Sequence, residues 1–197
     1  DRTVDIAHRA KQVVGQVFRY AVATGRAERD PTADLKGALK SRHKVHYAAI
    51  IQPEEVGRLL LAIEAYAGTP IVKSALQITA LTFQRPGLVR AMEWEHVDWD
   101  AAVWDVPPEA MQKTAKAGAA QRAHTVPLSR QAQKILSGLH RLTGRGRFVF
   151  PSARGRSRCL SDNGMRIALR TMGYDNSAMT PHGFRAMART LLDEALG

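Results

Sequence analysis

The pattern of hydrophobic and polar positions predicts that the chain starts with a long helix. Apolar side chains recur three or four residues apart between Ile6 and Ala21, which places them on one helical face, and Gly25 supplies a stop. An Asp-Pro pair at Asp30 then favours a turn. Because a single amphipathic helix cannot bury its own apolar face, we expect residues 1–48 to be the end of a domain whose beginning is absent, followed by a linker.

Two further helices are predicted in the next part of the chain. Pro53 suits the first position of a helix, and the two glutamates that follow it suit the positive end of the helix dipole. Thr69 and Pro70 open the next helix, whose apolar positions continue to Leu81. Both segments carry an apolar stripe, so we expect them to pack in a common core.

Short extended segments follow after residue 87. HVDWDAAVWDVPPEAM and AHTVPLS contain β-branched and aromatic runs broken by turn residues, which is typical of a small antiparallel sheet. The polar, glycine-containing segment between them, QKTAKAGAAQR, is predicted to be a hairpin loop. Ser129 and Ser161 each precede a predicted helix, with the short extended piece RFVFPS between these helices. The sequence therefore predicts an α+β fold, mainly helical with one small antiparallel sheet.

The charge of the chain narrows its possible partners. The 197 residues contain 29 Lys and Arg against 18 Asp and Glu, which gives a formal net charge of +11 and a pI near 10.4. A surplus of this size favours a polyanionic partner, most often nucleic acid, although a generic basic protein and one that touches anionic lipid are alternatives. The basic segment KGALKSRHKVH could contact backbone phosphates, or it could be a solvated spacer without contacts. Its candidate DNA-binding side chains are Lys36, Lys40, Arg42 and Lys44.

Composition also argues against several classes of protein. No apolar run approaches the roughly 20 residues of a membrane-spanning helix, and the first residues are not a signal peptide. Cys159 is the only cysteine, which excludes an internal disulfide and fits a reducing compartment, so we expect a cytoplasmic protein with no membrane partner. His43 and His46 have no cysteine or acidic residue nearby to complete a metal site. We expect neither a metal nor a cofactor.

A histidine and an arginine near the end of the chain form a candidate anion site. TPHGFRAMART places His182 and Arg185 three residues apart, directly after a proline that can open a helix. These positions share a helical face, and the first-turn N–H groups and the helix dipole favour an anion there. A guanidinium fits two phosphate oxygens, and an imidazole can move a proton near neutral pH. Arg85 stands between an apolar helix and a Pro-Gly turn, where its side chain can enter a cleft. Taken alone, each motif is better explained by solvated surface residues.

Taken together, the motifs resemble the catalytic domain of tyrosine recombinases, the phage integrase family. The similarity is greatest to the branch of prophage and genomic-island integrases related to satellite phage P4. Five segments match in the correct order: FRYAVATGRAERDPTADLKGAL, LTFQRPGLVRAMEWEHVDWD, HTVPLSRQAQKIL, VFPSARGRSRCLSDNGMRIALRTMGY and TPHGFRAMARTLL. This resemblance covers nearly the whole chain. It implies that residues 1–48 are the last helix and basic linker of a core-binding domain. It also implies that residues 49–197 are a catalytic domain with a three-stranded sheet, incomplete at its C-terminus.

The resemblance further implies a reaction. Family members cut a DNA strand without metal or nucleotide, through a tyrosine that attacks the phosphate and forms a 3′-phosphotyrosyl intermediate, which a second DNA end reseals. By this resemblance, Arg85 and Arg185 hold the non-bridging oxygens, and His182 binds the phosphate and assists proton transfer. Lys113 protonates the departing 5′ oxygen, with Lys116 as the alternative lysine and otherwise a DNA contact. The implied partners are double-stranded attachment sites and, for the full-length protein, further copies of itself in a homotetramer on DNA.

The match departs from the family pattern in two respects. The family's nucleophilic tyrosine lies downstream of the H-x-x-R motif, whereas all four tyrosines here precede His182, so we expect this chain alone not to cleave DNA. Leu88 stands where the family usually has an acid, and Phe83 where glycine is common, and both affect how Arg85 is held.

A type IB topoisomerase is an alternative enzyme, which the core-binding tail disfavours. A DNA-binding module that has lost its chemistry is the alternative from another class.

Overall fold

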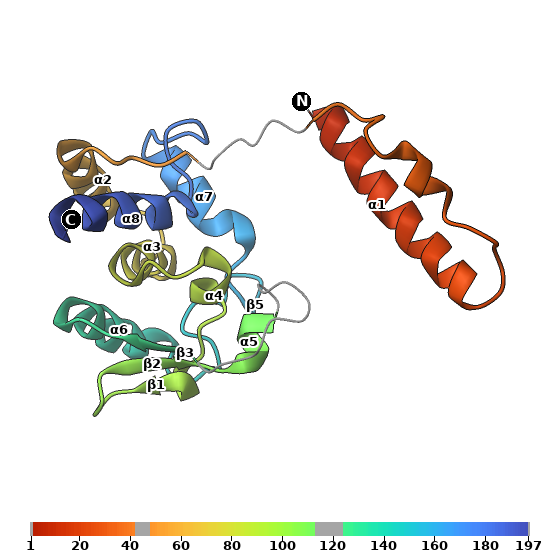
Figure 1. Cartoon of the computed structure of the whole chain (residues 1–197). Coiled ribbons are helices and arrows are strands. Elements are labelled where there is room, and N and C mark those ends of the chain that lie inside the picture. Colours follow the sequence, from red (N-terminus) through yellow and green to blue (C-terminus); the bar gives the residue numbers. More distant parts are fainter. Residues whose placement is uncertain (1, 42–47, 113–123, 197) are drawn as a thin grey trace. The chain divides into compact units, whose positions relative to one another are not determined.

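The computed structural model describes residues 2–41, 48–112 and 124–196, and the chain forms two compact units, Asp1–His46 and Tyr47–Gly197 (Figure 1). Among the described residues, no helix combines the length and the apolar composition that crossing a membrane requires.

The first unit begins with helix α1 (Arg2–Ala23), as the apolar spacing predicts. The helix ends shortly before Gly25, whose φ of +69° is the left-handed conformation that glycine adopts most readily. Within the described residues, the apolar face of α1 stays largely open. Six large apolar residues of α1 are at least 39% exposed, whereas Phe18 is half-buried. The six are Ile6, Val13, Val14, Val17, Tyr20 and Val22.

A short 3-10 helix, η1 (Pro31–Leu35), closes the first unit. Asp30 caps it by accepting hydrogen bonds from the backbone N–H and the hydroxyl of Thr32, at 2.9 and 2.7 Å. The same carboxylate forms an ion pair with Arg19 of α1. Gly15 allows α1 and η1 to approach each other, because a Cβ at Gly15 would lie only 2.7 Å from the Thr32 hydroxyl oxygen.

The second unit is built around helix α3 (Pro70–Thr82), which Thr69 caps through its side chain. Because α3 has neighbours on several sides, it buries polar as well as apolar positions. The buried hydroxyls of Thr79 and Thr82 each donate to a carbonyl one turn earlier, at 2.7 Å, so neither is left unsatisfied. The helices packed against α3 are α2 (Pro53–Ala65), α4 (Pro86–Arg90), α6 (Arg130–Thr143) and α7 (Asp162–Thr171).

A three-stranded antiparallel sheet follows α4 in the chain. Its strands are adjacent in sequence order: β1 (Val97–Asp98), β2 (Val103–Val106) and β3 (His124–Pro127). Trp104 lies opposite Val97 and Val126, and all three side chains point into the core. A second, two-stranded sheet pairs β4 (Pro151–Ser152) with β5 (Gly155–Cys159). The predicted α+β fold, mainly helical with a small antiparallel three-stranded sheet, is confirmed.

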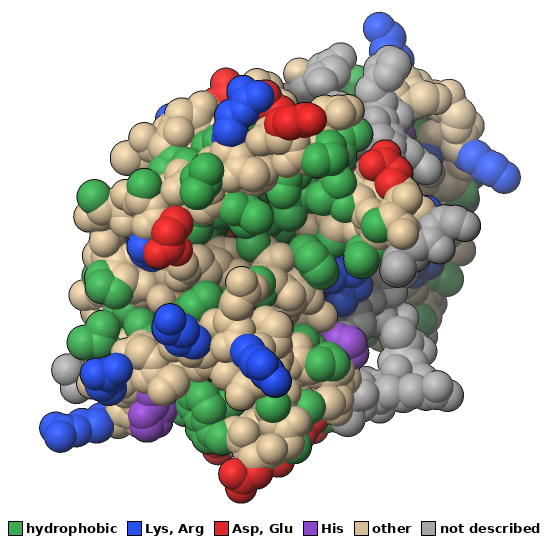
Figure 2. All heavy atoms as spheres, turned by 90° about the vertical axis from the view of Figure 1, so that its left-hand side faces the viewer, with side chains coloured by type: hydrophobic (Ala, Val, Ile, Leu, Met, Phe, Trp, Pro, Cys, Tyr) green, Lys and Arg blue, Asp and Glu red, His purple; other side chains and the backbone are tan. Residues whose placement is uncertain are grey.

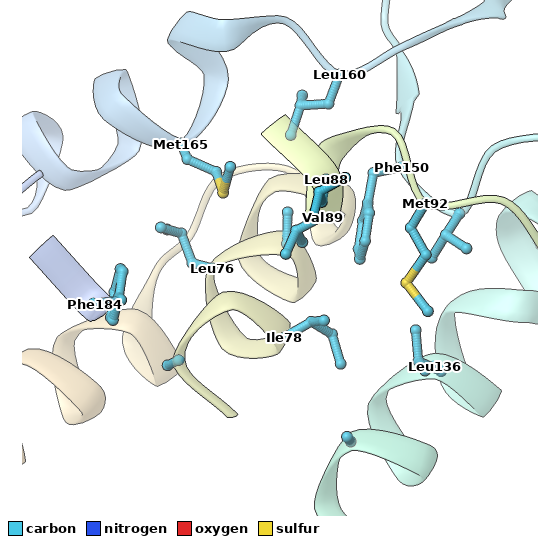
Figure 3. Packing of buried hydrophobic residues seen from close by; sticks show 14 of the residues in the cluster. Leu76, Ile78, Leu88, Val89, Met92, Leu136, Phe150, Leu160, Met165 and Phe184 are labelled. Carbon is cyan, nitrogen blue, oxygen red and sulfur yellow. The ribbon is translucent and has the colours of Figure 1, made fainter. Parts of the chain in front are cut away.

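The hydrophobic core joins every layer of the second unit (Figure 3). Ile78 of α3 lies near Leu136 of α6 on one side, and Leu76 lies near Met165 of α7 on the other. Phe150 and Phe184 are completely buried. This continuous packing gives the loop between α3 and α4, and the start of the last helix, a rigid support.

Two local predictions were wrong. The segment PPEAM was assigned to the extended region, but it forms the short helix α5 (Pro108–Gln112), because Pro108 at the first position can start a helix. Pro181 does not open the last helix: α8 (Gly183–Leu196) begins two residues later. The N–H of Gly183 instead donates to the carbonyl and hydroxyl oxygens of Thr180, at 2.8 and 3.1 Å, which closes a turn around the proline.

Candidate functional site

Arg85 lies at the junction between α3 and α4. It occupies the N-cap position of α4, and its carbonyl accepts hydrogen bonds from the N–H groups of Leu88 and Val89. At the other end of this short helix, Arg90 donates to the Leu160 carbonyl at 3.1 Å and forms an ion pair with Asp162 at the start of α7. These contacts fix both ends of α4. The Arg85 guanidinium is half-buried, and it forms no ion pair with any acid among the described residues.

Arg185 reaches the same junction from the first turn of α8. Its Nη1 donates a hydrogen bond of 2.7 Å to the carbonyl oxygen of Phe83, two residues before Arg85. The two residues joined by this bond are 102 positions apart in the sequence. The side chain itself is exposed to solvent, so most of the guanidinium donors stay available to a ligand. The structure therefore brings Arg185 beside the loop that carries Arg85.

His182 directly precedes α8, and the backbone around it is closely packed. Its carbonyl accepts from the N–H of Arg185 at 3.2 Å. The N–H of Thr180 donates to the Ala48 carbonyl, also at 3.2 Å. Between them, Gly183 leaves no room for a side chain, because a Cβ there would lie 2.4 Å from the Ala48 carbonyl oxygen. The glycine of the H-G-F-R motif thus allows the His182 turn to sit against the segment that leads into α2.

The electrostatics of His182 reflect both arginines. Its pKa lies below the ordinary value of 6.5 because burial disfavours the protonated ring, and because the positive charges of Arg185 and Arg85 repel a proton. The imidazole is therefore neutral at physiological pH, with one ring nitrogen as a donor and the other as an acceptor. Two of the four predicted catalytic side chains, Arg85 and Arg185, thus both act on a third, His182.

We expect Arg85→Gln and Arg185→Gln each to raise the pKa of His182 towards 6.5, because each removes a repelling charge. An NMR titration of the His182 ring measures this pKa directly. Arg189→Gln, on the solvent side of α8, serves as the matched control and should leave the titration unchanged.

The lowered pKa of His182 also means that protons bind the ring more readily in the unfolded chain than in the folded one. The contribution of His182 to stability therefore decreases as the pH falls through 6.5. A wild-type pKa above 6.5 would contradict this account.

The carbonyl that receives Arg185 is oriented by an unusual backbone conformation. Phe83 has φ 54° and ψ 21°, the left-handed region, and its N–H closes α3 by donating to Thr79 at 3.0 Å. Its ring packs against the core, and this packing offsets the steric cost of a side chain in that conformation. Glycine, which is common at this position in the family that the sequence resembles, adopts left-handed angles freely.

Two substitutions separate the backbone of Phe83 from its side chain. Phe83→Gly keeps the left-handed conformation and loses the ring, whereas Phe83→Val keeps an apolar side chain that is strained in it by about 1–2 kcal/mol. We expect Phe83→Val to displace the carbonyl from Arg185 and raise the pKa of His182, and Phe83→Gly to leave that pKa in place. The His182 titration by NMR distinguishes the two. Equal titration curves for both variants would mean that the carbonyl does not hold Arg185.

Leu88 is part of the hydrophobic core and only 4% exposed. The position that is usually acidic in the resembling family therefore points away from solvent here, into apolar surroundings. An acid at this place would have to pair with a cation to be tolerated. In this chain, rigid packing of α4 replaces any carboxylate as the means of orienting Arg85.

The remaining predicted site residues fall into two groups. Lys36 and Lys40 are exposed on the first unit, where the Lys40 carbonyl receives a hydrogen bond from the His8 ring at 2.9 Å. The others lie outside the described residues: Arg42, Lys44, Lys113 and Lys116.

A group of possible metal ligands lies elsewhere in the second unit. Side-chain atoms of Glu93, Glu95 and His96 lie within 4.8 Å of one another. However, Arg147 already donates to the Glu93 carboxylate at 2.7 Å. Burial raises the pKa of Glu93, but the hydrogen bonds with Arg147 and Glu95, together with the positive charge of Arg147, outweigh it and leave that pKa below its ordinary value. The Arg147 guanidinium would compete with a metal cation for the Glu93 carboxylate. We therefore interpret Glu93, Glu95 and His96 as part of an ion-pair cluster.

Two features of the site were not predicted from the sequence. The Phe83 carbonyl is a main-chain group, which no residue pattern identifies, although the departure from glycine at that position was an available signal. The ring of His124 bonds to the side chain of Gln84 at 3.2 Å, which ties the start of β3 to the residue before Arg85. This contact gives His124 a structural role.

Comparison with known sequences and structures gives consistent results. Residues 49–196 match the family described as "Phage integrase family", and residues 1–38 match "Phage integrase central domain". The chain is 33% identical over 200 residues to the integrase of Enterobacteria phage P4, covering 97% of this chain and 45% of that protein. It is 34% identical over 189 residues to the prophage integrase IntZ of Escherichia coli K12, covering 96% and 44%.

Solved structures share the fold at low sequence identity. The Tn1549 transposon integrase, in complex with a circular intermediate DNA, is similar with a TM-score of 0.68 at 13% identity, covering 97% of this chain and 67% of that one. A lambda integrase tetramer bound to a Holliday junction gives a TM-score of 0.60 at 18% identity, covering 95% and 54%. The chain spans about half the length of the curated relatives it matches.

Proposed function

Because this chain belongs to the phage integrase family of tyrosine recombinases, we propose that the protein recombines double-stranded DNA at specific attachment sites, cutting and rejoining strands through a 3′-phosphotyrosyl intermediate. The observation that carries this proposal is the approach of Arg185 to the Arg85 loop, with His182 in the field of both. Two guanidinium groups and an imidazole on rigid supports suit one phosphodiester.

In this proposal each side chain has a defined task. Arg85 and Arg185 bind the two non-bridging oxygens and neutralise the charge that builds up when the phosphorus becomes pentacoordinate. Neutral His182 donates a hydrogen bond to the phosphate and can take up a proton. Lys113 protonates the leaving 5′ oxygen, with Lys116 as the alternative. The reaction requires neither metal nor cofactor, because the guanidinium groups supply the positive charge.

The rest of the assembly follows the same proposal. Residues 1–48 form the end of a core-binding domain, whose linker contacts DNA phosphates through Lys36, Lys40, Arg42 and Lys44. Residues 49–197 supply the phosphate site. The nucleophilic tyrosine comes from sequence downstream of Arg185, and the full-length protein works as a homotetramer on DNA, the state in which lambda integrase is bound to a Holliday junction.

Covalent trapping tests the proposal. A longer chain that includes the downstream tyrosine is incubated with nicked DNA carrying its attachment site, and denaturing gels are used to detect a protein–DNA adduct. The adduct should form in the wild type and disappear when that tyrosine is changed to phenylalanine. If no adduct forms with any of several attachment sequences, the alternative is favoured: a DNA-binding module without cleavage activity.

Salt dependence tests the DNA contact separately from the chemistry. The affinity of the 197-residue chain for duplex DNA should fall steeply and linearly on a log–log plot against salt concentration, because bound phosphates release counterions. A chain that contacts about six phosphates loses about 10³-fold in affinity between about 50 and 200 mM salt. Fluorescence anisotropy of a labelled duplex measures this slope. An affinity that is constant over this range would rule out phosphate-dominated binding.

A further inference from the structure

Helix α6 carries a row of basic side chains that the proposed active site does not use. Arg130, Lys134 and Arg141 are all exposed. At about 100° per residue, spacings of four and seven place the three within about 40° of one another around the helix. We call these three residues the α6 stripe.

The α6 stripe lies on the outer side of the helix. The residues that α6 buries lie roughly opposite the stripe by the same angular count: Ala132, Leu136, Leu139 and Thr143. The buried side packs against α3. In Figure 1, α6 lies below α3 and α8 lies above it, so the stripe and Arg185 belong to different flanks of the unit.

The segment of chain that carries the α6 stripe is itself free of acidic residues. The segment from residue 129 to residue 148 contains no Asp or Glu. No member of the stripe forms an ion pair with an acid among the described residues, whereas nearby Arg147 is paired with Glu93. Arg145 is also exposed, just beyond the end of the helix. Figure 2, which views the left-hand side of Figure 1, shows several Lys and Arg side chains on the lower part of that face, with Asp and Glu side chains at its lower edge.

The dimensions of the α6 stripe suit a straight polyanion. Eleven residues of helix separate its ends, which at 1.5 Å per residue is about 16 Å, the axial rise of about five base pairs of DNA. The positions between Lys134 and Arg141 on this face are Ser137 and Gly138, whose small side chains do not hold a rod-like ligand away. The three stripe residues do not form a pocket and can contact only the charged backbone of a nucleic acid, so binding does not depend on the base sequence.

We propose that the α6 stripe binds the backbone of a second duplex DNA segment, while the Arg85 and Arg185 site holds the first. This inference rests on the proposed DNA function. It gives one chain the means to bridge two duplexes before strand exchange, which a site around a single phosphate cannot do.

A bridging assay tests the inference. One duplex is fixed to beads, the chain is added, and capture of a second, fluorescent duplex is measured beside ordinary single-duplex affinity. Lys134→Gln/Arg141→Gln removes two stripe charges. The matched control, Arg58→Gln/Arg189→Gln, removes two exposed charges from α2 and α8. We expect the stripe variant to capture the second duplex much more weakly than the wild type, and the salt slope of the remaining capture to fall by about 2, with single-duplex affinity retained. The control should bridge like the wild type.

Each other outcome overturns the inference in a recognisable way. If the wild type binds one duplex but captures no second one, or if the stripe variant bridges normally, the second surface does not exist and the proposed function stands. If the stripe variant loses single-duplex affinity as severely as bridging, the stripe belongs to the first DNA contact. If the wild type binds no duplex at all, the proposed function and this inference fail together.

Discussion

Arg185→Ala, in a longer chain that carries the downstream tyrosine, is expected to slow strand cleavage by about 10²–10³-fold, the usual cost of removing one donor that stabilises a transition-state oxyanion. We choose Arg185 over Arg85 because its hydrogen bond to the Phe83 carbonyl holds its side chain at the site before DNA binds. The rate of covalent adduct formation on nicked DNA, at saturating protein, measures the effect.

Arg189→Ala provides the control for this prediction. Arg189 lies one turn further along α8, is largely exposed, and pairs with Asp193. The Arg189→Ala substitution removes the same charge from the same helix as Arg185→Ala, yet it should leave the cleavage rate within about twofold of the wild type. If both substitutions slowed cleavage equally, the effect would come from general electrostatic attraction of DNA, and Arg185 would have no specific place in the transition state.

Phe184→Ala is expected to destabilise the second unit by about 3–5 kcal/mol, the range for truncating a fully buried aromatic side chain. Phe184 stands between His182 and Arg185 in sequence, but its ring is completely buried in the core (Figure 3). Since small domains are stable by only about 5–15 kcal/mol, the loss is a large fraction of the total.

Urea denaturation followed by tryptophan fluorescence measures this loss, because all three tryptophans lie in the second unit. Leu192→Ala, at a 47% exposed position of the same helix, is the matched control and should change stability by less than about 0.5 kcal/mol. A Phe184→Ala variant as stable as the wild type would show that the start of α8 is not anchored through this ring. In that case the rigid placement of Arg185 would lose its support.

Much of the fold was predictable because its signals are local. Pro53 and Pro70 begin α2 and α3 as predicted, and Ser129 caps α6 by accepting a hydrogen bond from the Ala132 N–H at 3.2 Å. Proline and cap residues act within one helical turn, so their effect is visible in a few consecutive letters. The wrong start of α8 has a local cause too, since Thr180 captures the N–H of Gly183 and delays the helix.

The sequence by itself determined the helices, the small sheet, the basic character and the family, because periodicity, charge and ordered motifs are properties of the letters. Only the tertiary structure decided that Leu88 is buried, that Phe83 adopts a left-handed conformation, and that its carbonyl receives Arg185. The bond between Arg185 and Phe83, for example, joins residues 102 positions apart. Such contacts form only when the whole core packs, so no local pattern can encode them.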